Sequence, residues 1–274
     1  MRVTVSAQAA ADVPFSSEAL DRIVSILGTE EARELRAEIV GLLAEGEPAD
    51  GRAARSHRTR RAIVEAMRTL HGEGDLRPRA ALIADRAGVS PRTVWQQFAD
   101  MEALLVEASR RDLEILMTML WPIDAGLPLD DRITRFVSRS ARIYERMAPG
   151  WRAARLHEPF SAELRRTKQR MNALGKAEIE AAFAPELCRL AGRRRIQLTS
   201  ALVGVGFWPF WDSLRTDVGA SPEQAQDIVA ALFAASLTGS GAEGRELAVI
   251  DVAVHGQVSA CPSRPVSTGA NPQP

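Results

Sequence analysis

Apolar residues recur every three or four positions along most of the chain, which is the spacing of amphipathic helices. Residues 17–27 and 30–44 show this spacing first, joined by a Gly-Thr pair. Together they predict a helical hairpin over residues 17–44, with an apolar stripe that needs a partner surface. Residues 46–58 are small, polar and increasingly basic, which predicts a linker.

The next segment predicts short helices followed by a longer one. Residues 59–70 and 79–87 each have an apolar face, and the second helix is expected to stop at Gly88. The Ser-Pro pair at residues 90–91 is a strong helix start, because Ser caps the first turn and Pro fits the first helical position. A further helix is predicted to begin at Asp100.

The second half of the chain predicts longer helices over residues 130–147, 161–183, 193–215 and 222–237. Pro209 should interrupt the third of them. The sequence Ser-Pro-Glu-Gln at the start of the fourth predicts a capping box. Gly, Ser and Pro accumulate in residues 239–274, which predicts a disordered tail.

The composition is that of an ordinary globular protein, with 274 residues, 46% of them apolar and 26% charged. No apolar run is long enough to span a membrane, and the N-terminal residues lack the apolar core of a secretory signal. We therefore expect a cytoplasmic protein without membrane contact. The cysteines and histidines show no zinc-ligand spacing, and no catalytic or nucleotide-binding motif is found. No metal, no cofactor and no enzymatic activity are expected.

The charges are unevenly distributed along the chain. The net charge is zero, yet residues 52–99 hold ten Arg against four acidic residues, a net charge of +6 that the remaining residues balance with −6. A local basic block of this kind is typical of a segment that binds a polyanion. A solvated charged face is the ordinary alternative, and charge alone leaves both open.

Residues 79–98 have the pattern of a helix-turn-helix. Val89, Val94 and Phe98 are predicted to face inward, and the last two should clamp the second helix onto Leu82 and Ile83. The predicted outward face consists of Arg92, Thr93, Trp95, Gln96 and Gln97. Arg, Thr and Gln are side chains that hydrogen-bond to base edges and phosphates.

Residues 58–105 resemble the N-terminal DNA-binding domain of the TetR family of bacterial transcriptional regulators. The matching positions occur in the family's order and spacing: Thr59-Arg60, Ile63, Ala66, Ile83-Ala84, residues 87–90, Thr93-Val94, Trp95, Phe98 and residues 102–105. The family commonly has Tyr at the position of Trp95 and Lys at that of Met101, and Met101 cannot neutralise a phosphate. Backbone N–H groups at the same helix start can still bind one. The head also begins well inside this chain, whereas in the family it begins near the N-terminus.

The resemblance implies an all-α, TetR-like fold: a three-helix, helix-turn-helix DNA-binding head and a helical ligand-binding and dimerisation body, here with an extra N-terminal helical hairpin. This divides the chain into an N-terminal extension (1–50), a DNA-binding domain (51–106), a ligand-binding and dimerisation domain (107–238) and the tail (239–274). In the family the last two long helices form a four-helix bundle between subunits. The corresponding segments here are residues 193–215 and 222–237.

The resemblance and the helix patterns together select two sets of candidate site residues. The DNA-binding set is Arg58, Arg60, Ser90, Arg92, Thr93, Trp95, Gln96 and Gln97. The effector-binding set is Met117, Trp121, Phe136, Tyr144, Trp151 and Trp208. For the aromatic residues of the second set, packing in a core or an interface is the alternative.

The predicted function is that of a DNA-binding transcriptional regulator, a homodimeric repressor that a small-molecule effector releases from DNA. Its expected partners are double-stranded DNA with a near-palindromic operator, a second copy of the chain and the effector. The alternative is a helical protein-interaction adaptor that uses the 17–44 hairpin and has a weak DNA-binding head.

Overall fold

The computed structural model of the protein describes residues 51–239, and every regular element in that range is a helix. The elements are α3 (Gly51–Gly72), α4 (Ala80–Arg86), α5 (Pro91–Gln97), α6 (Met101–Met119), α7 (Leu129–His157), the 3-10 helix η1 (Glu158–Phe160), α8 (Ala162–Ala182), α9 (Ala184–Leu187), α10 (Gly192–Gly206), α11 (Trp208–Thr216) and α12 (Pro222–Gly239). The hairpin predicted at residues 17–44 and the tail from residue 240 onward lie outside the described residues. None of the described helices is both long and apolar enough to cross a membrane.

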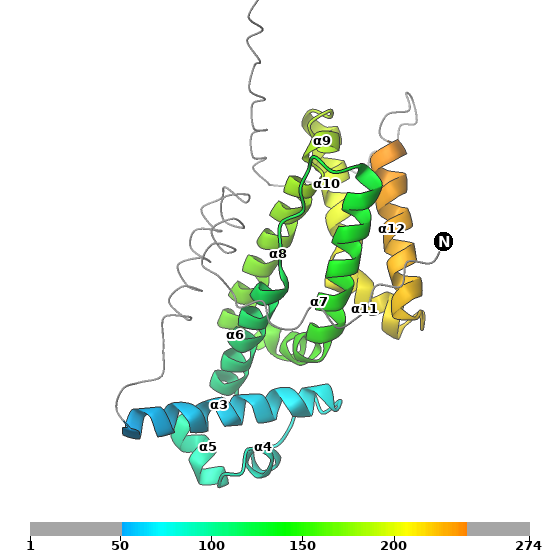
Figure 1. Ribbon diagram of the computed structural model, residues 1–274. Coiled ribbons are helices and arrows are strands. Elements are labelled where there is room, and N and C mark those ends of the chain that lie inside the picture. Colours follow the sequence, from blue (N-terminus) through cyan, green and yellow to red (C-terminus); the bar gives the residue numbers. More distant parts are fainter. Residues whose placement is uncertain (1–50, 240–274) are drawn as a thin grey trace, which may run out of the picture.

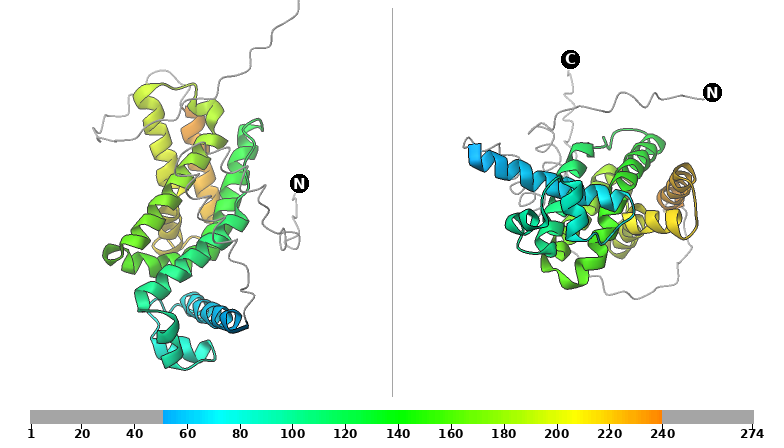
Figure 2. Two further views of the ribbon diagram at one scale, coloured as in Figure 1. Left: turned by 90° about the vertical axis from the view of Figure 1, so that its left-hand side faces the viewer. Right: turned by 90° about the horizontal axis from the view of Figure 1, so that it is seen from below.

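Helices α3, α4 and α5 form a head at one end of the molecule, and α9 lies at the other end (Figures 1 and 2). The core of the head collects buried apolar side chains from these helices and from the first turns of α6: Ile63, Met67, Ile83, Val94, Phe98, Leu104 and Leu105. Helix α6 therefore belongs to the head at its start and leaves it towards the body.

Two sequence predictions for the head need correction. Residues 51–58 are helical rather than a linker, since α3 begins at Gly51. Between Gly51 and residue 59 the chain has no proline, and its Ala and Arg residues are good helix formers, so the polar composition was misleading. Leu82 does not pack beneath α5: it is 41% exposed, whereas Ile83 is fully buried. A seven-residue helix has room for one buried face, and Ile83 with Ala84 forms it.

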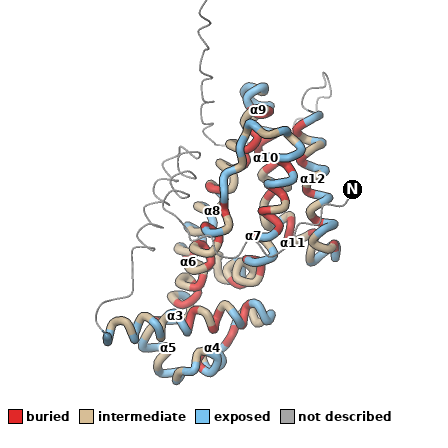
Figure 3. Tube along the Cα trace, in the orientation of Figure 1, coloured by how far each residue is buried: buried red, intermediate tan, exposed pale blue. Residues whose placement is uncertain are grey.

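The body is built around α7, which contacts α3, α6, α8, α11 and α12. At its centre the rings of Phe136, Phe183 and Phe233 meet with centroid distances of 5.3–5.8 Å, bringing α7, the end of α8 and α12 together. Figure 3 shows buried positions alternating with exposed ones along the body helices, as the amphipathic pattern predicts.

The predicted break near Pro209 is confirmed, because α10 ends at Gly206 and α11 begins at Trp208. Pro209 lies in the first turn of α11, where its missing N–H leaves no helical hydrogen bond unmade. The capping box of α12 is also confirmed: Ser221 N–H donates to Gln224 Oε1 at 2.8 Å, and Gln224 N–H donates to Ser221 Oγ at 3.2 Å.

Candidate nucleic-acid interface and ligand cavity

The turn between α4 and α5 has the local chemistry that its sequence predicts. Gly88 has a φ of +67°, a left-handed conformation that glycine adopts without strain. Ser90 then caps α5, its Oγ accepting a hydrogen bond from Thr93 N–H at 3.1 Å, and Pro91 takes the first helical position. The two helices thus meet in a tight turn that fixes where α5 starts.

Helix α5 is attached to the head through its predicted inward residues. Val94 is fully buried and Phe98, just past the helix end, is 2% exposed. This attachment leaves Arg92, Trp95 and Gln96 exposed on the opposite side. Trp95 is 45% exposed, which is unusual for so large an apolar ring and leaves it available to a partner.

The remaining α5 candidates are partly engaged within the head. The Thr93 hydroxyl lies 2.8 Å from that of Ser90. Gln97 Oε1 accepts a hydrogen bond from Ser56 Oγ at 3.2 Å, which connects the end of α5 to the start of α3. Both side chains are half-buried, whereas Ser90 itself is exposed.

Arg58 and Arg60 have different surroundings although both lie on α3. Arg58 is exposed. Arg60 donates to the Gln97 carbonyl at 2.6 Å and to Glu107 Oε2 on α6 at 3.3 Å, and its guanidinium lies 4.1 Å from the centroid of the Phe98 ring. Arg60 therefore joins α3, the end of α5 and α6 from inside the head.

The structure divides the arginines of the basic block into two groups. Arg60, Arg68 and Arg86 form ion pairs with carboxylates of the chain. Other arginines are exposed and form no ion pair within the described residues: Arg58, Arg61, Arg77, Arg79 and Arg92. Arg77 and Arg79 precede α4 directly, and sequence reasoning did not select them. Their place just before the first helix of the helix-turn-helix was the available signal.

The start of α6 is less suited to a phosphate than its sequence suggested. Asp100 Oδ1 accepts the hydrogen bond of Ala103 N–H at 2.7 Å, and Glu102 adds a second carboxylate to the first turn. Met101 is half-buried and packs against the head core. A negative charge already satisfies this helix terminus, which disfavours a further anion there.

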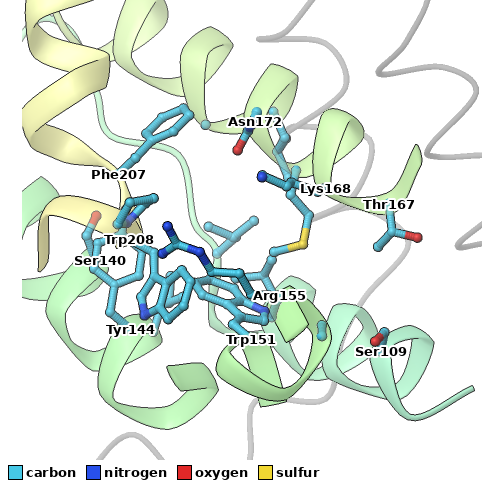
Figure 4. Close-up of a pocket in the computed structure, with 18 of the residues that line it drawn as sticks. Ser109, Ser140, Tyr144, Trp151, Arg155, Thr167, Lys168, Asn172, Phe207 and Trp208 are labelled. Atoms are coloured by element: carbon cyan, nitrogen blue, oxygen red, sulfur yellow. The ribbon is translucent and has the colours of Figure 1, made fainter. Parts of the chain in front are cut away.

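The body contains a cavity of about 210 Å³ between α6, α7, α8 and the break before α11 (Figure 4). Four of the predicted effector residues line it: Phe136, Tyr144, Trp151 and Trp208. Met117 is buried in a neighbouring apolar cluster and Trp121 is 41% exposed in the loop after α6, and neither lines the cavity.

Aromatic rings make up one wall of the cavity. Trp151 lies 5.9 Å from Tyr144 and 5.6 Å from Trp208, the latter in an edge-to-face arrangement. The lining residues outside the predicted effector set are Leu116, Leu120, Ile143, Ala154, Leu164, Met171, Leu174, Gly175, Phe207 and Pro209, with the polar Ser109, Arg139, Ser140, Arg155, Glu158, Thr167, Lys168, Asn172 and Glu178. The apolar periodicity placed most of these residues on helices, but it could not show which helix faces surround the cavity.

Two buried polar contacts support the inner part of the cavity. Arg139 Nη2 pairs with Glu178 Oε2 at 3.1 Å, and Arg139 also donates to the Trp121 carbonyl. Burial raises the pKa of Glu178, and the Arg139 charge opposes that rise. The Tyr144 hydroxyl donates to the Gly206 carbonyl at 2.5 Å, and burial raises the pKa of this phenol as well.

The contact between head and body is made by α3, α6 and α7. Arg68 Nε on α3 pairs with Asp112 Oδ1 on α6 at 2.7 Å, and burial raises the pKa of Asp112. Helix α7 passes so close that a Cβ on Gly150 would lie 2.2 Å from Asp112 Oδ2. His71, at the end of α3, is 2% exposed, and burial lowers its pKa to about 4.

Comparison with known proteins gives one structural similarity. A crystal structure of a protein from Mesorhizobium loti MAFF303099, named as a candidate TetR-family transcriptional regulator, aligns with 68% of this chain and 98% of its own, at 18% identity and a TM-score of 0.47. No protein-family model matches the sequence, and no curated protein matches it. In the described residues no three His, Cys, Asp or Glu side chains gather as a possible metal site.

Proposed function

We propose that the protein is a DNA-binding transcriptional regulator of the cytoplasm, a homodimeric repressor released from its operator by a small-molecule effector. The observation that carries this proposal is the geometry of α5. Its buried side, Val94 and Phe98, is fixed to the head, while Arg92, Trp95 and Gln96 are exposed. A short helix presented in this way by a tight turn suits insertion into a major groove.

The exposed side chains of the head have distinct expected roles on DNA. Arg92 and Gln96 can hydrogen-bond base edges, and the Trp95 ring can contact a thymine methyl. Arg58 lies on the same head and supplies a positive charge for phosphate. We place Ser90, Thr93, Gln97 and Arg60 in the same interface as residues that shape the ends of α5 and border the groove.

The second copy is expected to bind through α10 and α12. Ile228 and Leu232, one helical turn apart on α12, remain 37% and 36% exposed although the same helix buries Val229 and Phe233. An apolar face left uncovered on a well-packed helix suits a subunit contact. A two-fold dimer would place two α5 helices in successive major grooves, roughly 34–36 Å apart.

Helix α6 offers a direct route from effector to DNA. Its first turns contribute Leu104 and Leu105 to the head core, and its last turns contribute Leu116 to the cavity wall. An effector that binds better to one orientation of α6 would favour that orientation of the head. Release from DNA follows if this orientation separates the two α5 helices by the wrong distance.

The test is selection of bound sequences from a random duplex library with the full chain, followed by a gel shift on the selected sequence at several salt concentrations. We expect a near-palindromic sequence and a linear fall of log affinity with log salt. A folded dimer that enriches no sequence at moderate salt would contradict the proposal.

A further inference from the structure

Two buried hydrogen-bond donors near the cavity have no partner among the described residues. They are the indole Nε1–H of Trp208 and the Nε–H of Arg139, and both residues line the cavity. A buried donor without an acceptor is costly, so such groups are expected where a ligand supplies the acceptor. The neighbouring Tyr144 hydroxyl already donates to the Gly206 carbonyl and needs no acceptor.

The charges around the cavity leave a positive excess. The Glu178 carboxylate is paired with Arg139, and Glu158 at the rim is paired with Lys168, whose Nζ lies 2.8 Å from Glu158 Oε1. Arg155 also lines the cavity, and no ion pair within the described residues engages it. In Figure 4, Tyr144, Trp151, Arg155 and Trp208 lie on one side of the cavity, and Lys168 and Asn172 on the other.

The aromatic composition of the wall favours an aromatic ligand. Trp151 lies close to both Tyr144 and Trp208, and Phe207 lines the cavity next to Trp208. Aromatic ligands interact with such rings by stacking and edge-to-face contacts. A cationic ligand finds no free carboxylate here, because the two acidic side chains of the lining already have basic partners.

We propose that the cavity binds a planar aromatic carboxylate, with its ring against Trp151 and its two carboxylate oxygens at the Arg155 guanidinium and the Trp208 indole N–H. As the effector class of the regulator, this inference rests on the proposed function. The binding itself can be measured without DNA.

The experiment uses three probes of equal size that differ in charge: 2-naphthoate, 2-naphthamide and 2-naphthylmethylamine. Each is titrated into the full-length protein in a calorimeter, with tryptophan fluorescence as a second measurement. We expect 2-naphthoate to bind most tightly, the neutral amide about fivefold to tenfold more weakly, and the amine not measurably, because the uncompensated charge favours an anion.

Matched variants locate the binding. Trp208→Phe keeps an aromatic ring at this position but removes the indole N–H, so it should weaken 2-naphthoate by about fivefold. Arg155→Met should weaken 2-naphthoate by about tenfold and abolish its advantage over the amide. Trp95→Phe and Arg142→Met are the controls, since Trp95 lies in the head and Arg142 does not line the cavity. Thermal melts of all four variants check that they are folded.

Equal or tighter binding of the amine, or equal effects of the cavity and control variants, would overturn the proposal. Failure of all three probes to bind the folded protein would overturn it too. These outcomes differ from failure of the proposed function, because sequence-specific DNA binding is measured separately. If the protein selects an operator but does not bind 2-naphthoate, the proposed function stands and the proposed effector class is wrong. If it binds 2-naphthoate but selects no operator, the proposed cavity ligand stands and the proposed function is wrong.

Discussion

The arginines of the head fall into two sets, those in ion pairs and those that are exposed, and the sequence does not distinguish them. Arg60 and Arg68 hold the helices together through carboxylates of α3 and α6. Arg92 is exposed at the start of α5, with no ion pair within the described residues. The first group should affect stability, and the second should affect DNA binding.

Arg92→Ala is expected to lower affinity for the selected operator by about tenfold or more. A base contact would relax specificity at one position, and a phosphate contact would reduce the salt slope by about one. Fluorescence anisotropy on the operator and on single-base variants distinguishes the two. Arg189→Ala, on the exposed linker after α9, is the control. Equal affinities of the two variants would contradict a role for Arg92.

Arg60→Met tests whether this residue binds phosphate or holds α5 in place. Its guanidinium is engaged by the Gln97 carbonyl and Glu107, so we expect about 1–2 kcal/mol lower stability. DNA affinity should fall with little change in the salt slope. Urea unfolding and salt titrations measure the two effects. A slope reduced by about one with unchanged stability would instead assign Arg60 to phosphate.

Single residues also show where sequence reasoning reached its limit. Val94 and Phe98 could be assigned to the core because they are four positions apart on a helix with a clear start. The contact of Arg60 with Glu107 could not, since the two are separated by 47 positions and only packing of α3 against α6 brings them together. Trp121 was chosen for its aromatic ring, but the loop after α6 leaves it exposed.

At the scale of elements, α12 has two apolar sides. One packs inward through Phe233 and Leu237, and the other exposes Ile228 and Leu232. The helix predicted over residues 222–237 contains all four of these apolar residues. The sequence could not show that the body covers only some of them, because the width of the buried face depends on neighbouring helices.

The double variant Ile228→Glu/Leu232→Glu is expected to shift the protein from dimer to monomer. Four carboxylates would face one another across the proposed interface without partners, and desolvating them is costly. Light scattering after size exclusion measures the mass, and operator affinity should fall with it. Val218→Glu, at a 67% exposed position outside α12, is the control. A double variant that remains dimeric would place the interface elsewhere.

The close approach of α7 to α6 gives a second prediction. Gly150→Ala would bring a methyl group within 2.2 Å of Asp112 Oδ2, and Asp112 is buried and held by Arg68. We expect a loss of about 1–3 kcal/mol. Gly72→Ala, in the last turn of α3 with nothing within 4 Å, should be neutral or stabilising, since Ala favours helix by about 1 kcal/mol. Equal stabilities by urea unfolding would show that α6 and α7 can separate freely.

At the scale of the whole molecule, head and body meet at a junction that contains buried ionisable groups. His71 lies there in the last turn of α3, with Asp75, Arg68 and His157 as its ionisable neighbours. Its Nε2 has no hydrogen-bond partner among the described residues. A neutral imidazole is compatible with that environment, whereas a protonated one is not.

The junction should therefore weaken in acid. The unfolded chain protonates His71 near pH 6.5 and the folded chain only near pH 4, so its contribution is complete above pH 6.5 and is lost as the pH falls to about 4. The loss is roughly 1–2 kcal/mol after allowance for solvent screening. Melting temperatures from pH 7.5 to 4.5 should fall less steeply for His71→Gln than for the wild type. Identical slopes would contradict the assignment, and His57→Gln is the control.

The cavity was the least predictable part of the molecule. Phe136 and Tyr144 could be selected as aromatic residues of the helix predicted over residues 130–147, and Trp151 follows shortly after it; all three line the cavity. Glu178 and Arg139 were not selected, because a carboxylate and a guanidinium on separate helices look like solvated charges until packing buries them together.

The break between α10 and α11 lies between the cavity and helix α12, and it contacts both. Helix α10 ends at Gly206, whose carbonyl accepts a hydrogen bond from the Tyr144 hydroxyl. The next two residues, Phe207 and Trp208, line the cavity. A Cβ at Gly206 would lie 2.9 Å from the Phe233 ring of α12, so this turn has almost no freedom to shift. In the proposed dimer, a ligand that displaces either ring would therefore tilt the subunit contact itself. The shape of the cavity and the distance between the two heads would then change together.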